Sequence, residues 1–382
     1  MDRAAVSGDG WIRQVSPLIG EEEARAVHRV VESGWITEGP ESAAFVEELK
    51  EYVGARFAVL APNGTLALAL GLLALGVGPG DEVLVPDTTF VGSASAVALT
   101  GAKPVFVDVE PTTFQINMAD AERRATSATK AVMPVHLYGT ACDMTAVSAF
   151  ADERGLRVIE DAAQGMGVRF RGQHVGTFGD VGCFSFFADK TITTGEGGFV
   201  TCRDESTYER LRLLRNQGRM NSGTFIHPSV GFNFRITDMQ AAMGRVQLRR
   251  LSQIVERKQT LYAAYRDALS GIRGVRVLGA AEGANHVPFR CVALVDDAAP
   301  LMERLTSHQI ESRTFFYPLH LQPAFASLRG PDTSDRDFPN AVAGYEGGIC
   351  LPVHSGLTVD DVARIAGVIR DHQESPQGKG TL

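Results

Sequence analysis

Residues 131–160 read AVMPVHLYGTACDMTAVSAFADERGLRVIE, in which a helical pattern lies between two apolar runs. Asp143 is placed to cap that helix, and Gly155 stands where a glycine commonly ends one. One helix face is apolar and carries Met144, Val147 and Ala151. Strand, helix and strand in this order predict parallel pairing through a crossover, so this stretch predicts an α/β fold.

The same alternation continues on both sides of this stretch. Further apolar or β-branched runs typical of strands are Phe57–Leu60, Glu82–Val85, Pro104–Asp108, Cys183–Phe186 and Gly198–Thr201, besides Ala131–His136 and Arg157–Glu160 within the quoted stretch. We therefore expect a wide, mostly parallel mixed sheet between helices. Ligands of such sheets bind at the carboxyl ends of the strands.

The two ends of the chain predict additional units. Glu21–Ser33 is an amphipathic helix expected to turn Ala24, Val27 and Val31 inward. A long helical pattern runs from Thr237 toward Leu269 and is expected to link two domains. Beyond it, two strand patterns and a last helix describe a smaller α+β unit: Val275–Leu278, Phe289–Val295 and Val359–Ile369. We predict domains at 1–256 and 257–382, with the boundary near Arg257 and a frayed tail at 374–382.

Composition excludes several classes of protein. The chain has 382 residues and a formal net charge of -8, which argues against a general nucleic-acid or anionic-membrane binder. Its five cysteines form no CxxC pair, and its histidines show no metal-ligand spacing, so we expect a cytoplasmic protein without a metal site. The most apolar run, Leu66–Gly78, is too short to span a bilayer, and no signal segment opens the chain.

A single lysine stands out in SFFADKTITTGEGG, residues 185–198. Lys190 follows an apolar strand, and we expect it to lie beside apolar residues and away from carboxylates. Desolvation there would lower the pKa of the amine and make it a nucleophile toward an aldehyde. A lone loop lysine is more often a surface charge or a phosphate clamp, so this signal is weak by itself.

Two other stretches supply what an aldehyde cofactor needs. Asp161 ends the strand in VIEDAAQ, where a carboxylate can keep a ring nitrogen protonated, as pyridoxal phosphate requires; a helix N-cap is the alternative reading. In VLAPNGTLAL a strand, a turn at Asn63 to Thr65 and a helix offer free backbone N–H groups to a phosphate, although an ordinary capped turn looks the same. Ser185 offers a hydroxyl on the lysine side.

The chain resembles the DegT/DnrJ/EryC1/StrS family of nucleotide-sugar aminotransferases, which are fold-type I pyridoxal-phosphate enzymes. The motifs that carry the resemblance span nearly the whole chain and occur in the family's order: GWITEGP, NGTLAL, PDTTFVGSASAV, PVHLYG, VIEDAAQ, SFFADKTITTGEGG, VGFNFRITDMQAAMGRVQL and FFYPLHLQP. The resemblance implies that Lys190 holds the cofactor as a Schiff base and Asp161 pairs with its pyridine nitrogen. The remaining cofactor residues that it implies are Gln164 beside the ring, Phe90 stacked on it, and Ser185, Gly64 and Thr65 at the phosphate. Asn233 matches a phosphate ligand from the second subunit, so a homodimer with shared sites is implied.

The resemblance also implies a reaction. The family moves an amino group, commonly from glutamate, to a nucleotide-linked keto-6-deoxyhexose in a ping-pong cycle. The stretch after Lys190 looks most like the members that aminate C4 rather than C3, and PVHLYG with the Gln217 loop looks like GDP-perosamine synthases. Aminocyclitol transfer is the nearest rival. A pyridoxamine-type sugar dehydratase is a further alternative, but relatives of that kind have histidine where Lys190 stands. A cofactor-free scaffold is disfavoured because Lys190 and Asp161 are both present. A dinucleotide oxidoreductase is disfavoured by the glycine spacing of GVGPGDE.

Several loop residues are candidates for the sugar-nucleotide pocket. Their side chains are aromatic, hydroxyl-bearing or basic: Trp35, Thr37, Tyr317, His320 and Arg219. Arginine forks match phosphate oxygens, so Arg219, with Arg215 or Arg235, could neutralise a diphosphate; each alone is more often a surface pair.

Overall fold

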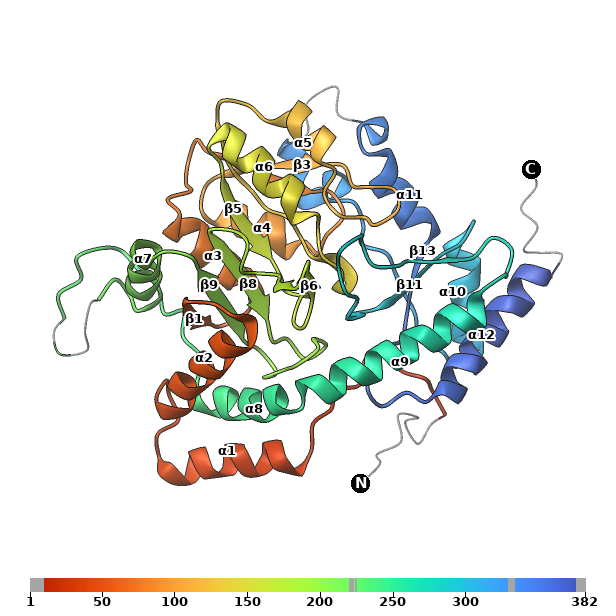
Figure 1. Cartoon of the computed structure of the whole chain (residues 1–382), viewed down its shortest axis with the longest axis horizontal. Helices are drawn as coiled ribbons and strands as arrows, with labels where there is room; N and C mark the ends of the chain where they lie inside the picture. The colour runs from red at the N-terminus through yellow and green to blue at the C-terminus, as the bar shows by residue number, and fades with distance from the viewer. Residues whose placement is uncertain (1–9, 220–222, 224, 329–333, 376–382) are drawn as a thin grey trace.

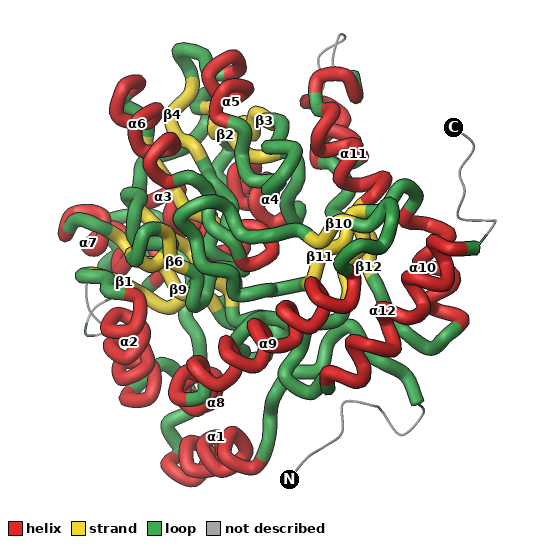
Figure 2. Tube along the Cα trace, turned by 45° about the vertical axis from the view of Figure 1, so that its right-hand side comes forward, coloured by secondary structure: helices red, strands yellow, loops and turns green. Residues whose placement is uncertain are grey.

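The computed structural model describes residues 10–219, 223, 225–328 and 334–375. A seven-stranded and a four-stranded sheet organise these residues, and a two-stranded ribbon is added to them. Helices surround both larger sheets (Figures 1 and 2). Of the tail expected at 374–382, all but Glu374 and Ser375 lies outside the described residues.

The large sheet has the order β1-β9-β8-β5-β4-β2-β3. Its strands are β1 Phe57–Ala61, β2 Glu82–Pro86, β3 Lys103–Val107, β4 Thr129–Val132, β5 Arg157–Asp161, β8 Val181–Ser185 and β9 Gly198–Cys202. Neighbouring strands from β8 to β3 are parallel, whereas β9 is antiparallel to both β8 and β1. The predicted α/β class with a mostly parallel mixed sheet is confirmed. Strand β4 ends earlier than predicted because Pro134 has no N–H to donate.

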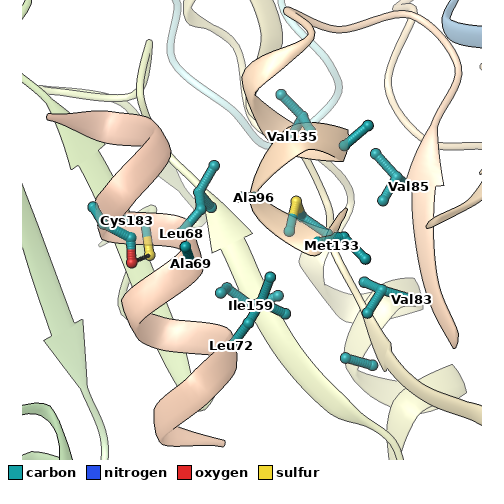
Figure 3. Close-up of a cluster of buried hydrophobic side chains, with 14 of the residues drawn as sticks. Leu68, Ala69, Leu72, Val83, Val85, Ala96, Met133, Val135, Ile159 and Cys183 are labelled. Carbon is teal, nitrogen blue, oxygen red and sulfur yellow. Dashed lines mark hydrogen bonds between the residues drawn. The ribbon is translucent and has the colours of Figure 1, made fainter. Parts of the chain in front are cut away.

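Helices cover both faces of this sheet. They are α2 Pro40–Val53, α3 Gly64–Ala74, α4 Gly92–Leu99, α5 Met118–Arg124, α6 Met144–Arg154 and α7 Glu205–Arg215. Side chains of α3 such as Leu68 and Leu72 pack with Val83 and Val85 of β2 in one core cluster (Figure 3). Leu84, between those valines, belongs to the cluster on the other face, as the two-residue period of a strand requires.

Local sequence signals set the ends of α6. The Asp143 carboxylate accepts hydrogen bonds from the amides of Thr145 and Ala146, and Gly155 takes a left-handed conformation with φ 65°. Both caps that the sequence predicts are therefore present, and the predicted apolar face is buried.

The first helix, α1, has the predicted bounds Glu21–Ser33 but a different buried face. Ala26 and Val30 pack against helix α8, Asp238–Arg249, whereas Ala24 and Val31 are exposed. The prediction of the inward face was wrong because two stripes of the helix are apolar, and the position of α8 decides between them. Glu23 on the buried stripe accepts hydrogen bonds from Gln247 and Arg250.

The long helical pattern after Thr237 forms two helices. α8 ends at Arg249, and α9, Leu251–Leu269, begins after Arg250, which has φ −92° and ψ −3°. Figure 1 shows α9 running from beside the large sheet toward the small one. We propose that the boundary between two domains lies near Arg257 within α9, since the two sheets lie on either side of it.

The small sheet is antiparallel throughout, with the order β10-β11-β13-β12. Its strands are β10 Arg276–Val277, β11 Cys291–Leu294, β12 Arg313–Thr314 and β13 Gly348–Leu351, and its helices are α10 Ala298–Ser307, α11 Pro339–Gly347 and α12 Val359–Glu374. The ribbon β6 Arg169–Phe170 with β7 Gln173–His174 and the 3-10 helices Leu137–Gly139, Leu319–Leu321, Pro323–Leu328 and Asp335–Asp337 complete the elements. Within the described ranges no helix is both long and apolar enough to cross a membrane.

Candidate active site

The carboxyl edge of the large sheet gathers the chemically interesting residues. Asp161 is the last residue of β5 and Ser185 the last of β8, and these two strands pair in parallel. Lys190 follows in the loop between β8 and β9, which closes as a hairpin with Ser185 opposite Gly198. The carboxylate, hydroxyl and amine that the sequence singles out therefore come from one edge of two adjacent strands.

Asp161 is buried and held by defined donors. Its Oδ2 accepts a hydrogen bond from Ser93 Oγ at 2.7 Å, and its Oδ1 accepts one from the Ala163 amide at 3.0 Å. Ser93 Oγ also lies 3.0 Å from Thr89 Oγ1. Burial raises the pKa of Asp161, and the bonds from Ser93 and Ala163 oppose that rise because they favour the ionised carboxylate. Asp161 makes no cap of a following helix, since none begins there.

The surroundings of Lys190 differ from the expectation in one respect. Its side chain is 15% exposed, and its Nζ lies 4.3 Å from the centre of the Phe289 ring, so the apolar neighbour is present. The Asp189 carboxylate, however, lies 3.8 Å from Nζ, so the amine is not away from carboxylates. Burial lowers the pKa of Lys190, which Asp189 and then Asp161 raise in part.

The start of α3 lies directly against Ser185. Asn63 caps the helix by accepting the Leu66 amide at 2.9 Å, and the amides of its first turn have no partner within the helix. A Cβ on Gly64 would lie 2.8 Å from Ser185 Cβ, so only glycine lets the two segments approach this closely. Thr65 Oγ1 lies 2.8 Å from where a Cβ on Gly92 would stand, which brings the start of α4 to the same corner.

Two further predicted residues follow strands β2 and β5, which lie on either side of β4 in the sheet. Phe90 follows β2 and is 58% exposed, with its ring 6.3 Å from that of Phe316. Such an exposed ring is available to stack on a flat ligand. Gln164 follows β5, is buried, and accepts the Tyr138 amide through Oε1 at 2.6 Å, which leaves its NH2 group as the donor.

These residues fit pyridoxal phosphate. The close approach of Gly64 to Ser185 places the first amides of α3, which lack a partner within the helix, beside the Ser185 hydroxyl. Such a group of donors suits a phosphate. The Asp161 carboxylate, ionised with the help of Ser93, suits a protonated ring nitrogen, and the Lys190 amine suits an aldehyde. Among described residues no group of three or more histidine, cysteine or acidic side chains could hold a metal ion.

The candidate pocket residues on loops are dispersed. Trp35 is 59% exposed and donates its Nε1–H to the Glu38 carbonyl at 3.1 Å, with Thr37 exposed beside it. Tyr317 is partly exposed and meets Tyr345 edge-on with ring centres 5.0 Å apart.

His320, in contrast, is 2% exposed. Its Nδ1 donates to Asp87 Oδ2 at 2.6 Å, its ring stacks on Phe338, and its Nε2 lies 3.4 Å from Asp335. It therefore holds the Tyr317 segment onto the end of β2 and turns no ring nitrogen toward open solvent.

Arg219 and Asn233 both belong to the segment between α7 and α8. Asn233 is exposed on the loop after α7 and accepts from Arg235 Nε at 2.9 Å. Arg219 lines a cavity of about 310 Å³, and its buried Nε has no hydrogen-bond partner in the described part of the chain. Arg215 lines the same cavity but already has partners, since it donates to the Leu60 carbonyl and to Glu38.

Sequence reasoning missed three residues of this site. Ser93 lies inside the motif PDTTFVGSASAV, so its hydroxyl three residues after Phe90 was a usable signal. Phe289 and Arg290 precede β11 and reach Lys190 and Asp189 from a segment about a hundred residues away, which no local pattern indicates.

Comparisons with known proteins agree with this geometry. The model of the DegT/DnrJ/EryC1/StrS aminotransferase family matches residues 17–370. A GDP-perosamine synthase of Caulobacter vibrioides is 38% identical over 361 residues, which is 93% of this chain and 96% of that protein.

Two solved structures have closely similar folds. One is DesV of S. venezuelae, solved in complex with a ketimine intermediate. Its TM-score is 0.88 at 35% identity, and the match covers 93% of this chain and 95% of the DesV chain. A putative sugar aminotransferase of Streptococcus pneumoniae, Spr1654, in its PLP form, has a TM-score of 0.90 at 28% identity over 95% of this chain and 99% of its own. The chain therefore belongs to the DegT/DnrJ/EryC1/StrS family and is a pyridoxal-phosphate-dependent aminotransferase, as its motifs predict.

Proposed function

We propose that this sugar aminotransferase moves an amino group from L-glutamate to C4 of a nucleotide-linked 4-keto-6-deoxyhexose. Similarity to a GDP-perosamine synthase at 38% identity supports this position of amination and favours a GDP-linked substrate. One observation carries the proposal: Asp161 ends β5 and Lys190 lies in the loop that follows the adjacent parallel strand β8, and both side chains are largely buried.

Each residue has a definite task in this proposal. Pyridoxal phosphate, when bound, supplies an electron sink and an aldehyde that carries the amino group between the two substrates. Asp161 keeps a proton at the ring nitrogen, and the start of α3 with Ser185 binds the phosphate. The Lys190 amine holds the cofactor between turnovers. Once the amino donor has released it, this amine takes a proton from the donor carbon as general base and later returns a proton as general acid. Phe90 covers one ring face and excludes water.

We also propose a homodimer whose sites are shared. Asn233, assigned to the phosphate, is exposed and accepts its hydrogen bond from the nearby Arg235, which leaves it accessible to a partner subunit. The loop before it is apolar and exposed: Phe225, Ile226 and Val230. An apolar loop of this kind fits a subunit interface. Arg219 on the same loop is our candidate for the substrate's diphosphate.

We place the enzyme in a reducing cytoplasm. All five cysteines are buried, and none forms a disulfide. Separate buried thiols are typical of that compartment.

Borohydride fixation tests the assignment of Lys190. The purified protein should be yellow, and reduction followed by peptide mapping should attach the cofactor to Lys190. Lys190→Ala should lose both the label and turnover, whereas Lys103→Ala, at an exposed lysine paired with Glu82, should keep both. A label on any other lysine would contradict the assignment.

A substrate panel tests the reaction. GDP-, dTDP- and UDP-linked 3- and 4-keto sugars and a cyclic ketone are each incubated with L-glutamate, and the products are identified by mass and fragmentation. We expect amination at C4 of a GDP-linked sugar. Amination only at C3, or only of the cyclic ketone, would overturn the assigned substrate while leaving the cofactor chemistry intact.

A further inference from the structure

A buried ion pair stands next to the reactive lysine. Arg290 Nη2 donates to Asp189 Oδ2 at 2.6 Å, and the two side chains are 7% and 14% exposed. Asp189 precedes Lys190 in the chain, whereas Arg290 precedes β11 of the small sheet. The pair therefore connects the lysine loop to a segment from the other half of the chain.

The unpaired oxygen of Asp189 is the one closest to Lys190. Asp189 Oδ1 lies 3.8 Å from Lys190 Nζ, is buried, and has no hydrogen-bond partner in the described part of the chain. A carboxylate at this distance favours the ammonium form of a lysine, and an ammonium has no lone pair with which to attack an aldehyde. Left alone, Asp189 would hold the lysine in its unreactive form.

Arg290 opposes this effect in two ways. Its hydrogen bond engages one oxygen and its positive charge offsets the negative charge of Asp189. Its guanidinium also lies 4.4 Å from the centre of the Phe289 ring, beside which Lys190 Nζ lies at 4.3 Å, so a second cation on that ring repels a charged Lys190.

We propose that Arg290 is a positioning residue that engages Asp189 and thereby favours the neutral form of the Lys190 amine, which is the form that can attack an aldehyde. The inference rests on the proposed role of Lys190. The charges around Lys190 agree with it: burial lowers the pKa of the amine, Asp189 and Asp161 raise it, and Arg290 lowers it. Lys190, Asp189 and Arg290 line one small cavity together with Lys258, whose Nζ donates to the carbonyls of Pro288 and Val353.

The test measures the pKa of Lys190 without turnover. The full chain, freed of cofactor, is labelled with acetic anhydride across a range of pH, and acetylation of each lysine is read by peptide mass. Exposed Lys130 serves as the internal reference. Arg290→Gln should raise the pKa of Lys190 by about one unit, so the midpoint of its labelling profile should move up by about one pH unit. Asp189→Asn should lower this pKa by a similar amount.

The double variant separates a role in the lysine's charge from a role in packing. With both charges removed, the Lys190 profile should return to within about a third of a unit of the wild type, although the ion pair is gone. Arg154→Gln, which removes an arginine from the surface pair with Glu122, should leave the profile unchanged.

Two results would overturn the proposal. An unchanged Lys190 labelling profile in Arg290→Gln would show that the arginine does not act on the amine. A double variant whose profile is shifted as far as that of Arg290→Gln would show that the arginine acts by packing alone. Neither result touches the cofactor assignment, because borohydride labelling decides that independently.

Discussion

The hydroxyl of Ser93, in the first turn of α4, donates to Oδ2 of Asp161 at the end of β5 over 2.7 Å. This bond joins two segments 68 residues apart and favours the ionised carboxylate, against the burial that raises its pKa. In the proposed function, Asp161 keeps a proton on the cofactor ring only while it is itself ionised, so Ser93 would support the electron sink.

Ser93→Ala should therefore slow turnover. A hydrogen bond to a charged group contributes about 1.5–3 kcal/mol, so we expect kcat to fall about tenfold or more. The pKa of Asp161 rises further without this donor, so the acidic limb of the kcat–pH profile should move to higher pH. Ser95→Ala on the same helix is the control and should leave the limb in place; an unmoved limb in Ser93→Ala would show that the bond is dispensable.

Gly64→Ala should weaken cofactor binding. The new Cβ would stand 2.8 Å from Ser185 Cβ and push α3 away from β8, which separates the helix amides from the serine hydroxyl. We expect about tenfold weaker binding of pyridoxal phosphate and about 1–3 kcal/mol lower stability from overpacking. Both are measured by absorbance titration and urea unfolding.

Gly279→Ala is a matched control for Gly64→Ala, because a Cβ there meets nothing within 4 Å. It should leave binding and stability unchanged. Equal cofactor affinity in the two variants would mean that the phosphate binds elsewhere.

His174 should make the stability of the protein depend on pH. It is buried, accepts the Gly167 amide at Nε2, and donates from Nδ1 to the Val175 carbonyl, so it is neutral. Burial lowers the pKa of His174 to about 4. The unfolded chain binds a proton first as the pH falls below 6.5, so the stability from this group is complete above 6.5 and lost toward pH 4.

The change is measurable by urea unfolding at pH 7 and pH 5. Between pH 7 and pH 5 the protonation of His174 should lower the free energy of unfolding of the wild type by about 2 kcal/mol. His174→Gln should lack this part of the decrease. His28→Gln at an exposed position should behave as the wild type does. Identical losses in all three proteins would show that His174 titrates normally.

Complementation tests the shared dimer site. In a mixed dimer of Lys190→Ala and Asn233→Ala chains, one of the two sites has both residues intact. Random mixing makes half the dimers mixed, so we expect about a quarter of wild-type activity from two inactive parents. Activity that stays at the level of the parents after verified subunit exchange would place Asn233 outside the partner's site.

Features with a local cause were predictable from the sequence. Asp143 and Gly155 fix the ends of α6 through bonds to adjacent amides and a left-handed turn, so the pattern alone contains them. The order of strands and helices likewise predicts the α/β class, and the motifs predict the family and cofactor.

Features decided by distant neighbours were not predictable. α1 has two apolar stripes, and only the position of α8 selects Ala26 and Val30 for burial. Arg290 looks like any arginine before a strand until the fold brings it to Asp189. His320 looks like a pocket residue until its bond to the buried Asp87 is seen.

The reversed direction of β9 has a consequence for movement. Since the chain returns beside β8 immediately, the loop that carries Lys190 is fixed at both ends by one ladder, and the Phe186 amide and carbonyl bond to Gly197 and Thr194 within it. Backbone opening there requires breaking the ladder, which is costly in the middle of a sheet. If Lys190 has the two roles proposed for it, the movement of its amine between them has to come from rotations about the lysine's own side-chain bonds.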